Sequence, residues 1–425
     1  MMSKHLLIVT RELAQDQIYG LGKSIAPVKV ELESLGWCVT YFSQAFMSEE
    51  EMACKSQLVT RAKKVFWALH FRNASLIEAL VERLYIGHLA AVFAQKHQVS
   101  HVHLHDPWLA VGYEISAFFG KIKAKLTPQS LGSEKSMLKR VGLSEHGFGA
   151  YFQAVRLDGV HMGGLALFVL KLLERQVCRQ MDWVIAPTEL ALKQLALDLG
   201  LTSPKDQIEF KTPFSKDQSS IQGSFPTHWF KVLHTLPDME HLARSQARER
   251  IGVPQDAKLI LSVGRLAPLK QFDLLIDIFA QLSPKFEKLH LFILGGGDQG
   301  TLQRQTRALG VESQVSFAFS NDVSLYYSAA DVYISASLTE SFGLANLEAL
   351  AYGLPCVCSQ VGGVPEVVKE AALLVHPSRE GLMVGLQAVL ADPLLAQSLS
   401  DRASVHAKNW PSTTEITQRY VQIYQ

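Results

Sequence analysis

The sequence predicts an α/β protein with two doubly wound, Rossmann-like domains that face each other across a cleft. Apolar runs of strand length alternate with segments of helical period along most of the 425 residues, and a second series of such runs starts at Lys258. Strands that alternate with helices are typical of parallel sheets covered by helices on both faces. Hydrophobic residues make up 48% of the chain, so sizeable cores can form and disorder is excluded as the main state.

Each half of the chain supplies one series of strands. In the first half, a helix near Ser24–Leu35 follows the first strand. The strands expected there are Leu6–Thr10, Val39–Phe42, Val102–His105, Lys125–Thr127 and Trp183–Ala186. Those expected in the second half are Leu259–Val263, Leu289–Leu294, Val315–Phe319, Val332–Ala336, Pro355–Ser359 and Leu373–Val375. Helical patterns separate the runs, so both sheets are expected to be parallel.

Composition places the division between the domains. The segment 202–238 is rich in Ser, Lys, Pro and Gln, which favours a linker or loop. We therefore expect an N-terminal domain at residues 1–225, a C-terminal domain at 226–408 and a terminal helix at 409–425. Two open sheets that face each other bind ligands in the crevice at the carboxyl ends of their strands.

Charge and cysteine content exclude several classes of protein. There are 41 Lys and Arg against 40 Asp and Glu, and a protein that coats nucleic acid usually has a basic excess. The five cysteines are few and odd in number, so a disulfide framework is not expected, and Cys356 and Cys358 fit a buried strand. The N-terminus predicts a first strand rather than a signal peptide. We expect a cytoplasmic protein.

Two glycine patterns resemble phosphate-binding motifs. Gly20-Leu21-Gly22-Lys23-Ser24 fails as a P-loop, because Gln17 stands where that motif needs glycine. A glycine turn that enters a helix still favours an anion, although a plain strand-to-helix turn explains it equally well. Gly295 to Gly300 matches the spacing of a dinucleotide fingerprint, and Asp322 lies about 20 residues on. This pattern favours an oxidoreductase, but it follows the second strand of its series instead of the first.

A richer pattern runs from Glu340 to Glu348. It follows the strand Val332–Ala336 and opens a helix that runs to about Tyr352. The backbone N–H groups of Phe342, Gly343 and Leu344 would be unpaired at the helix N-terminus, and that environment suits a diphosphate. The two carboxylates could accept hydrogen bonds from sugar or ribose hydroxyls. Taken alone, Glu340 is better explained as an N-cap acid and Glu348 as an ordinary surface glutamate.

Two cations stand at the same end of the predicted second sheet. Arg265 and Lys270 follow the strand Leu259–Val263, and together they would neutralise a leaving phosphate group. Each alone would be a solvated surface charge. Their coincidence with the Glu340 to Glu348 pattern favours a phosphate-binding site.

In the first half, His101, His103 and His105 alternate on a strand. This spacing can bind a metal ion, but no partner ligand is evident, so no metal site is expected. His105, at the strand end, is better placed to contact an acceptor molecule. Basic residues between Lys121 and Arg140, with Phe118 and Phe119 nearby, are typical of a solvated face; contact with a membrane surface is the alternative.

These residues together resemble the retaining nucleotide-sugar glycosyltransferases of family four, the glycosyl transferases group 1, whose fold is the two-domain GT-B type. The motifs that carry the resemblance are Gly264-Arg265-Leu266 with Lys270, Gly295-Gly296-Gly297, Glu340 to Glu348, and Val361-Gly362-Gly363-Val364-Pro365-Glu366. They cover nearly all of 258–425. In the first half the resemblance rests on Gly20 to Gly36, on Val102 to Asp106, and on Leu173 to Arg175 with Pro187 to Glu189.

The resemblance implies a role for each site residue. Arg265 and Lys270 would hold the donor diphosphate, with Gly264, the backbone of Phe342, Gly343 and Leu344, and the turn from Gly20 to Gly22. Glu340 would contact the donor sugar, Glu348 the nucleotide ribose and His105 the acceptor. The N-terminal domain would bind the acceptor and the C-terminal domain the donor.

The resemblance also implies the reaction. A sugar would pass from a nucleoside diphosphate to a glycan, a lipid-linked sugar or a small sugar, with retention of anomeric configuration and with neither metal nor other cofactor. The expected partners are therefore donor and acceptor, without nucleic acid, at the inner face of a membrane if the basic segment touches lipid. A non-catalytic nucleotide-sugar-binding protein and an NAD(P)-dependent oxidoreductase are the alternatives.

Overall fold

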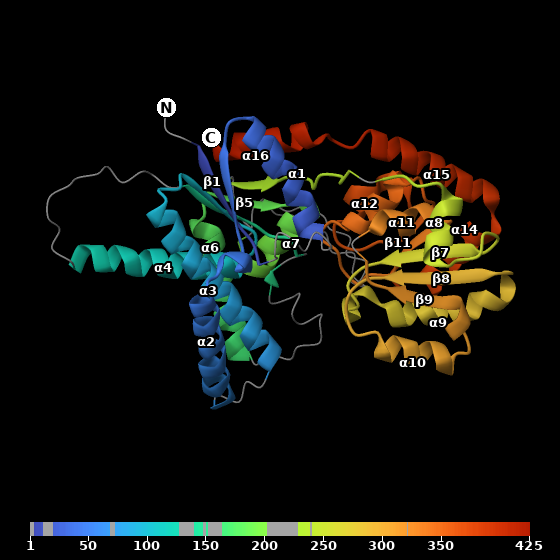
Figure 1. Ribbon diagram of the computed structural model, residues 1–425, viewed down its shortest axis with the longest axis horizontal. Helices are drawn as coiled ribbons and strands as arrows, with labels where there is room; N and C mark the ends of the chain where they lie inside the picture. The colour runs from blue at the N-terminus through green and yellow to red at the C-terminus, as the bar shows by residue number, and fades with distance from the viewer. Residues whose placement is uncertain are drawn as a thin grey trace.

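Two parallel sheets divide the computed structural model into an N-terminal and a C-terminal domain (Figure 1). The structure describes residues 4–11, 20–68, 73–126, 140–147, 150–151, 164–201, 228–238, 240–320 and 322–425. Each sheet has six strands, and the registers of neighbouring strands are parallel in both. The predicted α/β fold with two doubly wound domains is confirmed.

The N-terminal sheet has the strand order β2-β1-β3-β4-β5-β6. Its strands are β1 (His5–Val9), β2 (Cys38–Phe42), β3 (His101–Leu104), β4 (Arg140–Ser144), β5 (Trp183–Ala186) and β6 (Trp229–Lys231). Its described helices are α1 (Gly20–Ser34), α2 (Glu49–Ala68), α3 (Ala74–Lys96), α4 (Pro107–Leu126), α6 (Gly164–Gln180) and α7 (Glu189–Leu199). The strand order reverses between β1 and β3, which places a topological switch point there.

The C-terminal sheet has the strand order β12-β11-β10-β7-β8-β9, with its switch point between β10 and β7. Its strands are β7 (Lys258–Val263), β8 (Leu289–Leu294), β9 (Val315–Ala318), β10 (Val332–Ser335), β11 (Cys356–Ser359) and β12 (Leu373–Val375). Its helices are α8 (Arg244–Ile251), α9 (Phe272–Leu282), α10 (Gly300–Ala308), α11 (Val323–Ala329), α12 (Leu344–Ala351), α13 (Val364–Val368), α14 (Arg379–Ala391) and α15 (Pro393–Lys408).

Side chains alternate between two apolar layers on each sheet, as a strand period of two requires. In β1, Leu7 and Val9 pack with α3 and α4, whereas Leu6 and Ile8 pack against α1 on the opposite face. In β7, Ile260 faces α9 and α14, while Leu259 and Leu261 face α11 and α12. Both faces are covered, and this explains why strands such as β1, β5 and β8 are almost entirely apolar.

The last helix, α16 (Thr413–Tyr424), returns to the N-terminal domain and packs on α1 (Figure 1). Its Ile416, Tyr420 and Tyr424 join the core under β1 and β5. The helix starts with a capping box, in which the side chain of Ser412 accepts from the backbone of Glu415 and the Glu415 carboxylate accepts from the backbone of Ser412. The expected terminal helix therefore ties the C-terminal domain to the N-terminal one.

One predicted strand is wrong. Lys125 and Leu126, predicted to lie in a strand, belong to the end of helix α4, and Thr127 lies outside the described residues; the fourth strand is Arg140–Ser144 instead. Helix α1 also begins earlier than predicted, so Gly20 and Gly22 lie in its first turn and not in a turn before it.

The predicted boundary at residue 225 lies outside the described residues. So do Gln17 and residues 127–139 of the basic segment between Lys121 and Arg140. Strand β6, beyond that boundary, pairs with β5 and so belongs to the N-terminal sheet. All five cysteines are free, and Cys178, Cys356 and Cys358 are buried. Among the described helices, none alone is long and apolar enough to cross a membrane; one pair, α14 and α15, passes by length and composition but bends by 100°.

Candidate functional site

A pocket of about 270 Å³ lies at the carboxyl ends of the C-terminal strands, where the strand order reverses between β7 and β10. Its lining includes seven of the predicted site residues, namely Gly264, Arg265, Lys270, Glu340, Gly343, Leu344 and Glu348. Gly295 and Gly296 from the loop after β8 also line it. The fold therefore brings together the residues that the sequence places on three separate loops, at the position where open α/β sheets bind ligands.

Glu340 and Lys270 form an ion pair inside this pocket. The ammonium group of Lys270, at the end of the 3₁₀ turn Pro268–Lys270, donates to Oε1 of Glu340. The hydroxyl of Ser337 donates to the same oxygen over 2.9 Å. The two side chains are 21% and 17% exposed, so both remain within reach of a ligand in the pocket.

Glu348 is held more deeply than Glu340, because its side chain is only 5% exposed. The hydroxyl of Tyr327, on α11, donates to Oε2 of Glu348 over 2.9 Å. On the other side, Nζ of Lys23 donates to Oε1 over 3.2 Å. Burial, followed by the negative charge of Glu348, raises the pKa of Tyr327 well above its usual value, so that this phenol stays a neutral donor.

The N-terminus of α12 points at the pocket through Gly343 and Leu344. Gly343 has φ 78° and ψ 57°, in the left-handed region, and a Cβ there would lie 2.6 Å from Nδ2 of Asn346. Glycine is therefore required at this helix start. The first N–H groups of a helix lack intrahelical acceptors, so this end of α12 favours an anion.

Two glycines allow the loops after β7 and β8 to meet. A Cβ at Gly295 would lie 1.8 Å from the carbonyl oxygen of Gly264, and one at Gly264 would lie 3.3 Å from Cε of Lys270. The glycine-rich pattern from Gly295 to Gly300 thus lets backbone pack on backbone beside the pocket. Helix α10 begins only at Gly300, where the backbone N–H donates to Oδ1 of Asp298 over 2.9 Å.

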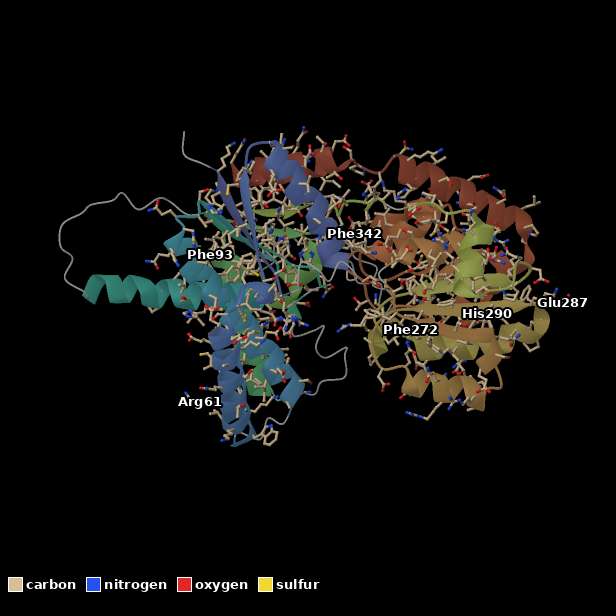
Figure 2. The ribbon with its side chains drawn as sticks, viewed as in Figure 1. Arg61, Phe93, Phe272, Glu287, His290 and Phe342 are labelled. Atoms are coloured by element: carbon tan, nitrogen blue, oxygen red, sulfur yellow. The ribbon has the colours of Figure 1, made fainter. Side chains whose placement is uncertain are left out.

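Phe342, Gly20 and Gly22 occupy different positions from the pocket lining. The Phe342 side chain is buried between the domains (Figure 2), where it contacts the rings of His234 and Trp410 edge-to-face. Gly20 and Gly22 belong to the first turn of α1, and from that turn Lys23 reaches the pocket. The backbone roles of these three residues stay predictions.

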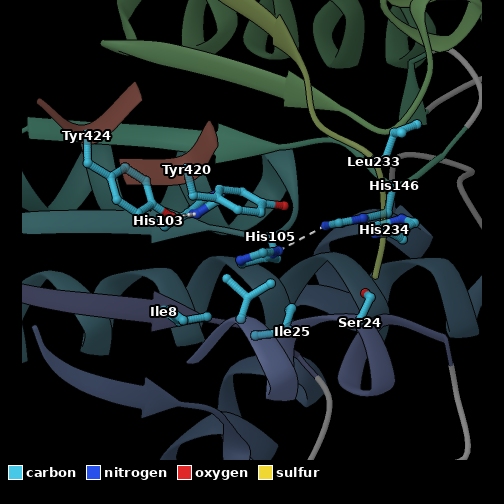
Figure 3. A pocket seen from close by; sticks show the side chains of 11 residues that line it. Ile8, Ser24, Ile25, His103, His105, His146, Leu233, His234, Tyr420 and Tyr424 are labelled. Carbon is cyan, nitrogen blue, oxygen red and sulfur yellow. Dashed lines mark hydrogen bonds between the residues drawn. The ribbon is translucent and has the colours of Figure 1, made fainter. Parts of the chain in front are cut away.

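His105 belongs to a row of four imidazoles that line a small cavity of the N-terminal domain (Figure 3). The rings of His103 and His105 stack at 4.2 Å, Nδ1 of His105 shares a hydrogen bond of 2.9 Å with Nε2 of His146, and His146 stacks on His234 at 5.4 Å. They line a cavity of about 10 Å³, which is the space of one water molecule. An acceptor-binding role of His105 therefore stays a prediction.

Burial keeps this row uncharged. It lowers the pKa of His103 to about 3 and that of His234 to about 4, and it holds the pKa values of His105 and His146 well below the usual range. Neighbouring imidazoles further lower the pKa values of His103, His105 and His146. No cluster of three or more His, Cys, Asp or Glu in the described part of the chain has the geometry of a metal site.

Buried carboxyl groups lie beside the histidines in the N-terminal domain. Glu145 follows β4, and Oε1 of its carboxyl group accepts the N–H of Gly147 over 2.7 Å. Burial, followed by the charge of Asp106, raises the pKa of Glu145 to about 8. Asp106 itself accepts from Nε of Arg83 over 2.7 Å. These groups lie directly after β3 and β4, in the N-terminal domain.

Direct contacts hold the two domains together around the Glu340 loop. Thr188, which caps α7, donates to the carbonyl of Ser341 over 2.8 Å, and the hydroxyl of Ser341 donates to the carbonyl oxygen of His146 over 2.5 Å. The carboxylate of Glu366 accepts the N–H of Leu190, at the start of α7, over 2.6 Å. The loop that carries Glu340 therefore takes its position from both domains.

The sequence alone assigns no site role to Lys23, Tyr327 or His234. The position of Lys23, directly after Gly22 at the predicted anion-binding helix start, could have marked it. His146 belongs to the segment from Glu145 to Met162, for which the sequence suggests only a part in acceptor specificity. Tyr327 and His234 carry no local pattern, since only packing brings them to the site.

Residues 243–406 match the family model Glycosyl transferases group 1. Among curated proteins, the D-inositol 3-phosphate glycosyltransferase of Streptomyces coelicolor is 32% identical over 199 residues, which cover 43% of this chain and 44% of that protein. The chain spans less than half the length of the curated relatives it matches.

Solved structures align over the whole chain. WaaG, a glycosyltransferase involved in lipopolysaccharide biosynthesis, aligns with a TM-score of 0.66 and 15% identity over 99% of both chains. HepE from Anabaena, in complex with UDP-glucose, aligns with a TM-score of 0.64 and 16% identity over 98% of both chains. The arrangement of two Rossmann-like domains is therefore the GT-B fold.

Proposed function

We propose that this chain is a retaining glycosyltransferase that moves a sugar, of the hexose type, from a nucleoside diphosphate to an acceptor in the cleft. The observation that carries the proposal is the pocket between β7 and β10, where Arg265, Lys270, Glu340, Glu348 and the N-terminus of α12 line one cavity. The match of residues 243–406 to the group 1 glycosyl transferases supports it, as does the complex of the neighbour HepE with UDP-glucose.

Each group in the pocket would bind one part of the donor. Arg265 and Lys270, with the first N–H groups of α12, would hold the diphosphate. Glu348 would accept hydrogen bonds from the ribose hydroxyls, and Glu340 from the sugar. These assignments match charged donors to the phosphates and carboxylate acceptors to hydroxyl groups.

In the proposed step, the acceptor hydroxyl oxygen attacks the anomeric carbon on the face that the diphosphate leaves. The bond from that carbon to the phosphate oxygen breaks, a bond to the acceptor oxygen forms, and the acceptor proton passes to the leaving phosphate. Configuration is retained without a protein nucleophile. The residues contribute by stabilising the charge of the departing diphosphate. Because Arg265 and Lys270 supply this stabilisation, we propose that transfer is independent of metal and of any other cofactor.

The acceptor would bind on the N-terminal side of the cleft, and His105 is the residue proposed to contact it. We propose a glycan, a lipid-linked sugar or a small sugar, and a cytoplasmic enzyme that contacts the inner face of a membrane. Polysaccharide biosynthesis is the process in which such a product is used. No nucleic acid is proposed as a partner, in keeping with the balanced charge of the chain.

The described part of α2 favours the membrane contact. From Met52 to Ala68 this helix carries four basic residues and no acidic one, and its last turn exposes Val65, Phe66 and Trp67. Basic and aromatic residues on one helix suit an interface with anionic lipid. Flotation with phosphatidylglycerol vesicles should recover the protein, whereas phosphatidylcholine vesicles or the double variant Phe66→Ser, Trp67→Ser should not. Equal recovery in all three cases would contradict the contact.

A thermal-shift panel of UDP, GDP, ADP, NAD and NADP, each with and without EDTA, tests the function. Because a ligand that binds only the native state raises its stability, one nucleoside diphosphate should raise the melting temperature to the same extent in EDTA. A shift with NAD or NADP alone would overturn the proposal in favour of an oxidoreductase. Loss of the shift in EDTA would contradict metal independence.

The corresponding sugar donor then separates an enzyme from a non-catalytic binding protein. Slow hydrolysis of the donor needs no added acceptor and should release the nucleoside diphosphate. Glu340→Gln should reduce that rate by more than 100-fold with little change in melting temperature, while Glu287→Gln, at an exposed position far from the pocket (Figure 2), should leave it unchanged. Donor binding without any turnover would favour the binding protein.

A further inference from the structure

Lys23 crosses from one domain to the other and enters the donor pocket. It lies in the first turn of α1, in the N-terminal domain, whereas the other residues that line the pocket in the described chain belong to the C-terminal domain. Its Nζ donates to Oε1 of Glu348 over 3.2 Å, and the two side chains are 14% and 5% exposed. This lysine is mostly enclosed and pairs with a residue 325 positions away in the sequence. It is therefore part of the cleft and not a solvated surface charge.

The side chains that line the pocket carry more positive than negative charge. Lys23, Arg265 and Lys270 bring three positive charges, against the two carboxylates of Glu340 and Glu348. Each lysine is paired with one of these carboxylates. The two carboxylates are also the groups proposed to accept hydroxyl groups of the donor, so binding of the donor must compete with both lysines.

An exchange of partners resolves this competition. A lysine side chain is a mobile point charge on a flexible stem, and a phosphate oxygen is a strong acceptor for it. When the ammonium group moves from Glu348 to a phosphate, Oε1 of Glu348 becomes open to a ribose hydroxyl. Oε2 stays bonded to Tyr327, which keeps the carboxylate in place during the exchange. The N-terminus of α1, directly behind Lys23, adds a second attraction for an anion.

We infer that Lys23 is a diphosphate-binding residue supplied by the N-terminal domain, and that its ammonium group exchanges Glu348 for a donor phosphate when a nucleoside diphosphate binds. The inference rests on the proposed function and adds to it a third cation and a means of coupling donor binding to the contact between domains. Without donor, Lys23 pairs with Glu348 across the cleft. With donor, the same lysine binds a donor phosphate across the cleft.

The exchange predicts different effects on the affinities for two ligands. Replacing Lys23 with methionine removes the phosphate contact, so affinity for the nucleoside diphosphate should fall about 10- to 100-fold, as expected for one charge-assisted hydrogen bond. The same variant frees Glu348, so affinity for the nucleoside without phosphates should stay equal or rise. Lys23→Arg, which keeps the charge, should retain most of the diphosphate affinity.

Isothermal titration of the full chain measures both affinities, with the nucleoside diphosphate that binds the wild type and with its nucleoside. The matched control is Lys231→Met, which removes another ion pair between the domains, to Glu366 at 3.8 Å, outside the pocket. That variant should bind both ligands as the wild type does. Melting temperatures of the three variants identify any that fail to fold, and Lys23→Arg then carries the comparison.

The outcomes separate this inference from the proposed function. A wild type that binds no nucleoside diphosphate overturns the function and, with it, the role of Lys23. A wild type that binds, with unchanged diphosphate affinity in Lys23→Met, overturns the phosphate contact alone. An equal loss for nucleoside and diphosphate also overturns it, because Lys23 would then only hold the domains together.

Discussion

Replacing His234 with phenylalanine should remove part of the acid sensitivity of this fold. His234 lies between the domains, stacked on His146 at 5.4 Å and edge-to-face with Phe342 at 4.8 Å. Burial lowers its pKa to about 4, whereas a histidine in the unfolded chain titrates near 6.5. Between these values the unfolded chain binds the proton and the native chain does not. The contribution of neutral His234 to the free energy of unfolding is therefore fully present above about pH 6.5, and it is lost as the pH falls below that value.

The size of the effect follows from the unfolded pKa, because at pH 5 the native imidazole is still neutral. Protonation then favours the unfolded chain by about 2 kcal/mol relative to pH 8. His103, whose pKa lies at about 3, contributes a similar amount. Together the two groups remove about 4 kcal/mol, which is a large fraction of the usual 5–15 kcal/mol of a domain.

Urea unfolding at pH 8, 6 and 5 measures the free energy of unfolding for wild type and variant. His234→Phe keeps an aromatic ring in the stack and removes one titrating group. The loss of stability between pH 8 and pH 5 should therefore be smaller by about 2 kcal/mol. The control His376→Phe, at an exposed position, should keep the wild-type loss. If His234→Phe lost as much stability as the wild type, His234 would not be a neutral buried group, and the reasoning would fail.

Three further substitutions test the site. Tyr327→Phe removes the hydroxyl that donates to Glu348, so nucleoside diphosphate affinity measured by titration should fall about 2- to 10-fold, whereas Tyr326→Phe should leave it unchanged. Gly343→Ala should lower the free energy of unfolding in urea by more than the roughly 1–2 kcal/mol that a left-handed backbone costs a non-glycine residue, because the added Cβ meets Asn346. Gly310, with φ 69°, has open space around it, so Gly310→Ala should show only this backbone cost. Equal losses in the two variants would exclude the clash with Asn346. Glu145→Gln should raise the free energy of unfolding by about 3 kcal/mol at pH 7 and by about 1 kcal/mol at pH 5. Burial raises the pKa of Glu145 to about 8, so the native carboxyl group holds a proton that the unfolded chain releases. A gain in stability that does not depend on pH would contradict this sign.

The sequence predicted the two sheets well because their strands are buried on both faces. The alternation of Leu6 to Val9 between two helix layers requires apolar residues at every position, and such runs are visible without any structure. One of the strands that were not predicted, β4, has the sequence Arg-Val-Gly-Leu-Ser and lacks that pattern. A Cβ at Gly142 would lie 2.1 Å from the ring of Trp183 in the adjacent strand. The apolar surface over β4 comes from its neighbour, so no local pattern marks this strand.

The same distinction separates the predicted site residues from those that were missed. Arg265, Lys270, Glu340 and Glu348 follow strands of one sheet, and parallel strands end at one edge, so their meeting follows from the topology.

Lys23 belongs to the other sheet, and its distance from Glu348 depends on how the two domains pack. That packing rests on contacts such as Thr188 with Ser341 and on the return of α16 across the cleft. None of these contacts has a periodic pattern in the sequence, because each joins segments more than 150 residues apart. A donor site assembled within one domain is thus readable from motifs, whereas the charge that the second domain adds to it is set by tertiary packing alone.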